Sequence, residues 1–244
     1  MVIVDMDIEE DMLKRSSQGI NTDRYDVLEQ LADKILSISC RHPLRVAVDG
    51  IDAAGKTFLA DELVIPLEKS GRQVIRTSVD GFHNPKEIRY RLGENSPEGY
   101  YRDSFNYEAV VNTLLKPLGP DGDRYYFRSV FDYRKEKPVD APKELASSDS
   151  ILVFDGIFLL RPELIKYWDF SIFVYVDFST AITRGIRRYF DVSIHPSDED
   201  SIRRKYVARY IPGQQIYLKE SEPRQRADLI LDNNNFEHPK IILN

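Results

Sequence analysis

The stretch from Gly50 to Thr57 has the residue types and the spacing that bind nucleotide phosphates. Its sequence, GIDAAGKT, matches G-x-x-x-x-G-K-[ST] at every fixed position, between a strand-like and a helix-like run. In such a loop, backbone N–H groups surround phosphate oxygens, the lysine reaches the β- and γ-phosphates, and the hydroxyl binds Mg²⁺. A strand-to-helix turn that matches by chance is the alternative. We predict a nucleoside triphosphate site lined by Gly50, Ile51, Asp52, Ala53, Ala54, Gly55, Lys56, Thr57 and Phe58, with Lys56 catalytic.

Candidate carboxylates for the same chemistry follow three apolar runs, each of which ends in Asp-Gly: Asp49, Asp80 and Asp155. An Asp-Gly pair is often only a turn, because Asp bonds its own backbone and Gly tolerates positive φ. The carboxyl ends of parallel strands, however, meet at one edge of a sheet, where ligands bind. We predict that Thr57 and Asp155 hold Mg²⁺, as in a Walker B arrangement. Asp80 is expected to accept the proton of an acceptor hydroxyl and to lie at the metal, while Asp49 only orders the loop.

Phosphoryl transfer also needs cations over the transferring group. Arg184, Arg187 and Arg188 stand at i, i+3 and i+4, so they share one face of a helix. We predict that Arg184 and Arg188 are catalytic and that Arg187 contacts the substrate. A solvated, salt-bridged helix pair is the alternative interpretation of this basic cluster.

An acceptor needs a pocket, and the segment from about residue 84 to 142 can supply it. This segment is rich in Tyr, Arg, Pro and Gly, and we predict that its Tyr101 and Asp103 contact the acceptor. We interpret it as an insertion over one end of a sheet, with residues 124–134 forming a strand or hairpin. His83, just before it, is either a substrate contact or a half-buried turn histidine.

The elements that must position these residues follow from hydrophobic periodicity. Residues 22–38 have apolar side chains at helical spacing after a possible Thr22 N-cap. Nearly continuous apolar runs separated by helix-length segments predict an α/β fold with a parallel sheet buried on both faces. We expect a leader and helix over 1–40 and one domain over 41–244. The strand-like runs are 44–49, 73–79, 151–155, 170–177 and 227–232.

Composition excludes several classes of function. A formal net charge of −6 argues against general nucleic-acid binding, and Cys40 is the only cysteine, so an internal disulfide is impossible. The start of the chain lacks a basic signal-peptide region, and the longest apolar run is too short to span a bilayer. No N-K-x-D run of a guanine-nucleotide switch is present. We expect a cytoplasmic protein without nucleic-acid or membrane partners.

The motifs together resemble the uridine kinase family of P-loop kinases, which is related to pantothenate kinase and phosphoribulokinase. The resemblance covers about residues 44–235 and rests on VAVDGIDAAGKT, SVDGFH, RDSFNYEAV, LVFDGIFLL, TRGIRR and the closing RYIPGQQIYLKESEPRQRADLILDN. It implies a P-loop NTPase fold of three α/β/α layers with a five-stranded parallel sheet and a lid over about 184–213. It also implies that Asp80 is the catalytic acid, that Asp103 holds ribose hydroxyls and that the arginines begin the lid.

The chain departs from that family at three places. It has Ile51-Asp52-Ala53-Ala54 where the family has a Ser-rich loop, Asp155 where the family has Glu, and His83 near a family Tyr. We therefore expect an ATP- and Mg²⁺-dependent kinase that phosphorylates a nucleoside of the uridine or cytidine type, or a similar metabolite. A kinase for pantothenate or a sugar phosphate and a nucleotide-binding regulatory ATPase are the alternatives. A homo-oligomer is left open.

Overall fold

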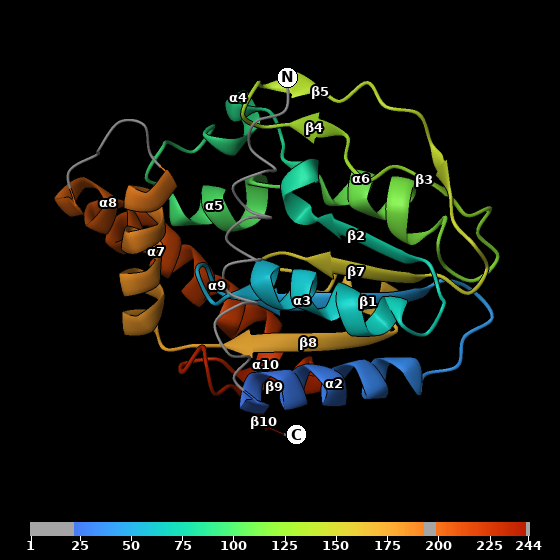
Figure 1. Cartoon of the computed structure of the whole chain (residues 1–244). Helices are drawn as coiled ribbons and strands as arrows, with labels where there is room; N and C mark the ends of the chain where they lie inside the picture. Colours follow the sequence, from blue (N-terminus) through green and yellow to red (C-terminus); the bar gives the residue numbers. More distant parts are fainter. Residues whose placement is uncertain (1–21, 193–198, 243–244) are drawn as a thin grey trace.

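A six-stranded sheet forms the centre of the molecule, a computed structural model that describes residues 22–192 and 199–242 (Figure 1). Five strands are parallel, as predicted, and a sixth pairs antiparallel at one edge. The edge strand was missed because its three residues carry no periodicity of their own. In spatial order the strands are β10 (Lys240–Ile242), β9 (Leu229–Asp232), β8 (Phe170–Tyr175), β1 (Leu44–Gly50), β7 (Ile151–Asp155) and β2 (Val74–Ser78).

Alternate residues of the central strands face two different hydrophobic clusters. In β1, Val46 and Val48 join one cluster and Ala47 joins the other; in β7, Val153 and Phe154 divide in the same way. Side chains of a strand point to opposite faces in turn, so a strand that is apolar throughout must be covered on both sides. The sheet is therefore the middle layer of three.

One face is covered by α2 (Thr22–Leu36) and α3 (Lys56–Glu68). The helix predicted for residues 22–38 is confirmed, and its fully buried Leu31 and Ile35 belong to the same cluster as Leu59 of α3. The predicted acidic leader lies outside the described residues.

The segment predicted as an insertion covers part of the other face. Its helices are α4 (Lys86–Arg89), α5 (Pro97–Asp103), α6 (Tyr107–Val110) and η2 (Val111–Leu115). Residues 124–134 do not form one hairpin, because β3 (Tyr125–Tyr126) pairs with β6 (Glu144–Leu145) and β4 (Phe131–Asp132) pairs with β5 (Lys137–Pro138). Hydrogen bonds from Phe127 N to Thr113 O and from Val130 N to Gly81 O separate these two pairs.

Helices at the carboxyl ends of the strands occupy the region predicted as a lid (Figure 1). They are α7 (Phe178–Val192), α8 (Glu199–Lys205) and η4 (Tyr206–Tyr210), followed by α9 (Ile211–Ser221) and α10 (Pro223–Arg226). Residues 193–198 of the predicted lid lie outside the described part of the chain. Two short turns, η1 (Val79–Phe82) and η3 (Ile165–Tyr167), complete the fold. Within residues 22–192 and 199–242, no helix is long and apolar enough to cross a membrane.

Candidate active site

The predicted phosphate loop connects β1 to α3 and wraps closely against its neighbours. Gly50 and Gly55 have positive φ angles of 151° and 94°. A Cβ on Gly50 would lie 2.4 Å from Val174 O, and one on Gly55 would lie 2.6 Å from Asn233 Nδ2. Both positions therefore require glycine for their backbone angle and for the close approach of a neighbour. The first turn of α3 follows at once, so its free N–H groups face the loop.

Lys56 lies inside this loop and is buried. Its Nζ donates a hydrogen bond to Ile51 O at 2.7 Å, so the ammonium group is held against the loop's own backbone. Burial lowers the pKa of Lys56, and the charges of Asp52, Asp155, Asp49 and Asp80 oppose that change. A partly dehydrated cation with four carboxylates around it is suited to accept additional negative charge from phosphate.

Thr57 and Asp155, the predicted metal ligands, are in direct contact. Thr57 Oγ1 donates to Asp155 Oδ2 at 2.7 Å, and Asp155 is buried at the end of β7. Hydroxyl and carboxylate oxygens are the donors that Mg²⁺ prefers, so this pair fits a hard cation. Arg76 Nη1 lies 2.8 Å from Asp155 Oδ1 without forming a directed hydrogen bond, and Arg76 Nε donates to Asp61 Oδ1 at 2.7 Å. The sequence signal for Arg76 was an arginine in the middle of an apolar strand.

Asp80 lies in the turn η1, but its carboxylate does not build that turn. The side chain of Ser78 caps η1 by accepting a hydrogen bond from Asp80 N at 3.3 Å. Among the described residues, none donates a hydrogen bond to the Asp80 carboxylate, which is exposed. Desolvation by the surrounding protein raises the pKa of Asp80; Asp155 adds to this, whereas His83, Lys56 and Arg188 lower it. The group is therefore open to a ligand and close to the other charges of the site.

His83 is held beside Asp80 between two aromatic rings. Its Nδ1 lies 2.9 Å from Asp80 O, and a carbonyl only accepts, so Nδ1 carries the hydrogen. The His83 ring lies 4.5 Å from the ring of Phe105 and 4.4 Å from that of Tyr133, between centroids. Burial lowers the pKa of His83, which favours a neutral imidazole whose Nε2 can accept a hydrogen bond.

Asp103 is buried at the end of α5 and is already paired. Its carboxylate accepts hydrogen bonds from Arg91 Nε at 2.8 Å and from Arg91 Nη2 at 2.7 Å. The Arg91 side chain is 61% exposed, so a ligand can reach the pair from the arginine side. A role for Asp103 in holding hydroxyls stays a prediction and now includes Arg91.

Tyr101 lies in the core, away from any open surface. It is 2% exposed, its hydroxyl lies 3.2 Å from Ser221 Oγ, and its ring packs against Phe158. The prediction that Tyr101 contacts the acceptor does not agree with this position, because a side chain enclosed by core rings presents no atom to a ligand. The neighbouring Tyr100 instead donates from its hydroxyl to Asp52 Oδ2 at 2.5 Å.

Asp52 is the unusual residue of the phosphate loop, and two residues that were not predicted hold it. Besides Tyr100, the side chain of Gln214 in α9 accepts a hydrogen bond from Asp52 N at 2.6 Å. Burial, with the adjacent Asp52 charge, raises the pKa of Tyr100 well above its usual value, so the phenol stays a donor. The departure of Asp52 from a Ser-rich loop was the only sequence signal for these contacts.

The three predicted lid arginines divide into two groups. Arg184 Nη2 donates to the carbonyl oxygens of Asn233 and Asn234 at 2.9 and 3.0 Å, beside the phosphate loop. Arg187 and Arg188 are exposed. Arg188 is near enough to Asp80 to lower the pKa of that carboxyl. The structure therefore places Arg188 at the predicted base and Arg184 at the loop after β9.

Phe58 is the predicted cofactor contact that faces outward. Its side chain is 48% exposed, and its ring makes an edge contact with Phe236 at 5.8 Å. Phe236 belongs to the same loop that Arg184 contacts at Asn233 and Asn234. The exposed Phe58 ring beside the phosphate loop offers an apolar surface next to the predicted nucleotide.

Comparisons with known proteins find the same fold, although no family model matches the chain. A uridine-cytidine kinase of Dictyostelium discoideum is 28% identical over 196 residues, which cover 78% of this chain and 75% of the relative. A solved structure of a possible uridine kinase from Bacillus stearothermophilus has a TM-score of 0.66 at 23% identity, covering 84% of this chain and 97% of that one. A candidate fructose transport system kinase from a Silicibacter species has a TM-score of 0.66 at 20% identity, covering 80% and 95%. At such identities the two structures show the fold alone.

Proposed function

Proceeding from its place in the uridine kinase-like family of P-loop kinases, we propose that this chain transfers the γ-phosphate of ATP to a nucleoside hydroxyl. The resemblance predicted from the sequence is confirmed at the level of the family. The chain is a phosphotransferase with an alcohol acceptor. The identity of the donor as ATP, of the metal as Mg²⁺ and of the acceptor as a uridine- or cytidine-like nucleoside are parts of the proposal.

The observation that carries the proposal is the open Asp80 carboxylate at the carboxyl edge of the sheet. It shares that edge with Lys56 and with the Thr57–Asp155 pair, and the charges of Lys56, Asp155 and Arg188 all act on it. In our proposal Asp80 orients the acceptor hydroxyl and takes its proton. Lys56 and Arg188 stabilise the negative charge that spreads over the transferring phosphoryl group.

Thr57 and Asp155 would hold the metal that such transfers use. When bound, Mg²⁺ supplies positive charge to the phosphate oxygens and fixes their orientation. The direct contact between the hydroxyl and the carboxylate supports this assignment, because it holds the two oxygens 2.7 Å apart. Arg76, which forms an ion pair with Asp155, would hold that carboxylate in position.

The surroundings of His83 favour a nucleoside over an aliphatic acceptor. A neutral imidazole with a free Nε2 can accept a hydrogen bond from a ring N–H or an exocyclic amino group. The half-buried Tyr133 provides flat apolar surface of the kind on which a base packs, while the buried Phe105 holds the imidazole from within the core. Asp103 lies at the end of helix α5 and is paired with Arg91, which precedes that helix. Together these two side chains would contact the sugar hydroxyls.

An acceptor screen tests this proposal. The purified chain is incubated with ATP and Mg²⁺ and with uridine, cytidine, other nucleosides, pantothenate or sugar phosphates, and ADP release is measured. We expect uridine or cytidine to stimulate ADP release strongly and to be recovered as the monophosphate. If only pantothenate or a sugar phosphate stimulates ADP release, the proposal of a nucleoside acceptor is refuted. ADP release that no acceptor changes would favour the regulatory ATPase. Repeating the screen with GTP tests the donor.

A further inference from the structure

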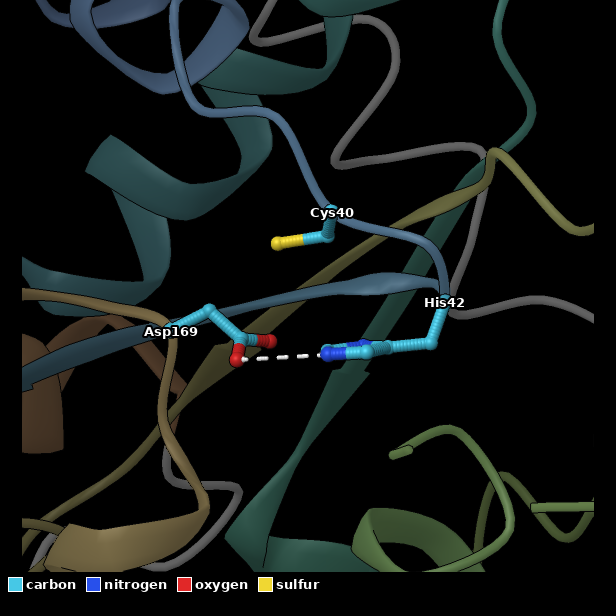
Figure 2. Close-up of side chains that lie close together, drawn as sticks. All are labelled: Cys40, His42 and Asp169. Carbon is cyan, nitrogen blue, oxygen red and sulfur yellow. Dashed lines mark ion pairs between the residues drawn. The ribbon is translucent and has the colours of Figure 1, made fainter. Parts of the chain in front are cut away.

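A second cluster of chemically active side chains lies at the edge of the sheet opposite the phosphate loop. Cys40 and His42 belong to the segment between α2 and β1, and Asp169 directly precedes β8. Figure 2 shows the three side chains pointing toward one another from these two segments. All three are half-buried, so solvent reaches the cluster. None of them takes part in the chemistry proposed above.

The three side chains are close enough to share one ion. One ligand atom from each, Sγ, a ring nitrogen and a carboxylate oxygen, lies within 4.8 Å of the others. His42 Nε2 and Asp169 Oδ1 are 3.9 Å apart. A tetrahedral zinc ion with bonds of about 2.0–2.3 Å separates its ligand atoms by about 3.5 Å. Small movements of side chains would therefore bring all three into the bonding range.

His42 turns its Nε2 toward the cluster. Its Nδ1 lies 3.0 Å from Pro43 O, and because a carbonyl can only accept, Nδ1 carries the hydrogen. In the neutral imidazole, Nε2 is then a bare acceptor, and it faces a carboxylate oxygen. Donation of the other ring N–H to a backbone carbonyl is the usual arrangement of a metal-bound histidine.

Asp169 is oriented by Arg45, as metal-binding carboxylates are by outer partners. Arg45 N and Nε both donate to Asp169 Oδ2 at 2.9 Å, and Arg45 Nη2 donates to Oδ1 at 2.9 Å. One lone pair of Oδ1 remains, and Oδ1 is the oxygen nearest to His42. Two acceptors that face each other at this distance are stabilised by a cation between them. The Arg45 charge weakens such a site, while its hydrogen bonds fix the orientation of the carboxylate.

We propose that Cys40, His42 and Asp169 bind one Zn²⁺ ion, with water as the fourth ligand. A set of one sulfur, one nitrogen and one oxygen donor suits zinc, whereas Mg²⁺ and Ca²⁺ take oxygen donors. Binding forms a zinc–sulfur bond and releases the thiol proton to solvent, without any redox change. The ion would link the segment before β1 to the segment before β8.

Thiol reactivity tests the site directly, because Cys40 is the only cysteine of the chain. The whole protein is freed of metal with a chelator, and labelling of the thiol by a chromogenic disulfide is followed with and without added Zn²⁺. We expect one equivalent of Zn²⁺ to slow labelling at least tenfold, and Mg²⁺ to have no effect. Labelling at the same rate with and without Zn²⁺ would overturn the proposal.

Variants separate this site from other histidines. Zn²⁺ affinity, measured by competition with a chromogenic chelator, should fall at least about tenfold in His42→Gln and in Cys40→Ser. His83→Gln and His238→Gln are matched controls, and their affinity should equal that of the parent. Co²⁺ in place of Zn²⁺ should give a sulfur-to-metal absorption band that Cys40→Ser lacks. Affinity that depends on His83 and not on His42 would place the ion at the active site and refute the proposal.

Discussion

At the scale of single residues, three aspartates with the same local sequence occupy three different environments. Asp49 is fully buried and accepts hydrogen bonds from Tyr217 and from Leu159 N. Asp155 is buried and pairs with Thr57, while Asp80 is exposed. An Asp-Gly pair at a strand end thus predicts where the carboxylate is, and its neighbours decide what the carboxylate can do.

The proposed base is tested by replacing Asp80 with Asn. Asn has the same shape but does not accept a proton, so Asp80→Asn should keep its melting temperature and bind ATP while kcat falls at least about a hundredfold. Because the pKa of Asp80 is raised, protonation should lower kcat of the parent at a higher pH than an ordinary aspartate would allow. Near-normal kcat in the variant on its best acceptor would contradict the assignment.

Asp49 gives a prediction about stability and pH. Burial raises the pKa of its carboxyl to about 6 from an ordinary value of 3.8, although the Tyr217 and backbone hydrogen bonds lower it. Between these values the folded chain keeps the proton and the unfolded chain loses it. This group therefore lowers the free energy of unfolding by roughly 3 kcal/mol as pH rises from about 4 to 6.

The Asp49→Asn variant isolates that contribution. Asn does not titrate. Its Oδ1 can accept from Leu159 N and its Nδ2 can donate to the Tyr217 hydroxyl, so the variant should gain stability relative to the parent as pH rises through this window. Above about pH 6 the difference should stay constant. Urea unfolding of both proteins at several pH values measures it. A difference that does not change with pH would show that Asp49 has the same pKa in the folded and unfolded states.

At the scale of elements, helix α2 is connected to the nucleotide side of the sheet through one arginine. Arg24 donates to Glu62 in α3 from Nε at 3.1 Å and from Nη2 at 2.5 Å. Its Nη1 donates to Phe236 O at 2.7 Å, and its guanidinium lies 4.0 Å from the Phe236 ring centroid. Asn233, in the same loop, donates to Ala54 O at 2.7 Å. Arg24 therefore holds the loop after β9 against the phosphate loop.

Arg24→Ala should weaken nucleotide binding more than it slows the chemical step. We expect Kd for ATP to rise about tenfold, which corresponds to ~1.4 kcal/mol, with a smaller change in kcat. Binding of a fluorescent ATP analogue and steady-state kinetics measure the two effects. Glu29→Ala is the matched control, because it removes an exposed ion pair of the same helix with Lys69. Equal effects of both substitutions would indicate that only helix stability matters.

The lid helices give a second prediction at this scale. Arg188→Ala should lower kcat more than it raises the Kd for ATP, because a lid cation acts mainly in the closed complex. Arg203→Ala in α8 is the control, since Arg203 forms an exposed ion pair with Glu199 at 2.9 Å that should contribute little. If both variants keep the parent kcat, the basic cluster is only a solvated helix surface.

At the scale of the whole molecule, we propose that the boundary expected between residues 1–40 and 41–244 does not separate two units of folding. Leu31 and Ile35 of α2 are fully buried in the same cluster as Val46 and Leu59. A helix that supplies core residues to the sheet should unfold together with it. We therefore propose that residues 22–242 melt as one unit, with α2 as part of it.

Leu31→Ala tests this unit with a distant reporter. Removing a fully buried leucine side chain costs about 2–5 kcal/mol. The unfolding midpoint reported by Trp168, the only tryptophan, should fall, although Trp168 packs on the cluster at the other face of the sheet. Gln30→Ala, at an exposed position of α2, should leave the midpoint in place. If Leu31→Ala leaves the unfolding midpoint reported by Trp168 unchanged, α2 unfolds separately.

The sequence by itself determined the parts of this protein that depend on local patterns. The phosphate loop, the parallel strands and α2 can each be recognised from the spacing of residues within one short segment of the chain. The expected fold and reaction class also followed, because the loop, Asp80 and Asp155 are read from short motifs. Strand ends also placed both carboxylates at one edge, since parallel strands all end on the same side of a sheet.

Only the tertiary structure decided which distant side chains meet. Tyr101 is a core residue, Asp103 is paired with Arg91, and Arg24 reaches Phe236, none of which periodicity can indicate. The antiparallel strand β10 is likewise defined by its partner β9. Cys40 and Asp169 lie far apart in the sequence and come together because β1 and β8 pair in parallel, which aligns the segments that precede them. Such contacts depend on packing between whole elements, and packing is a property of the folded chain.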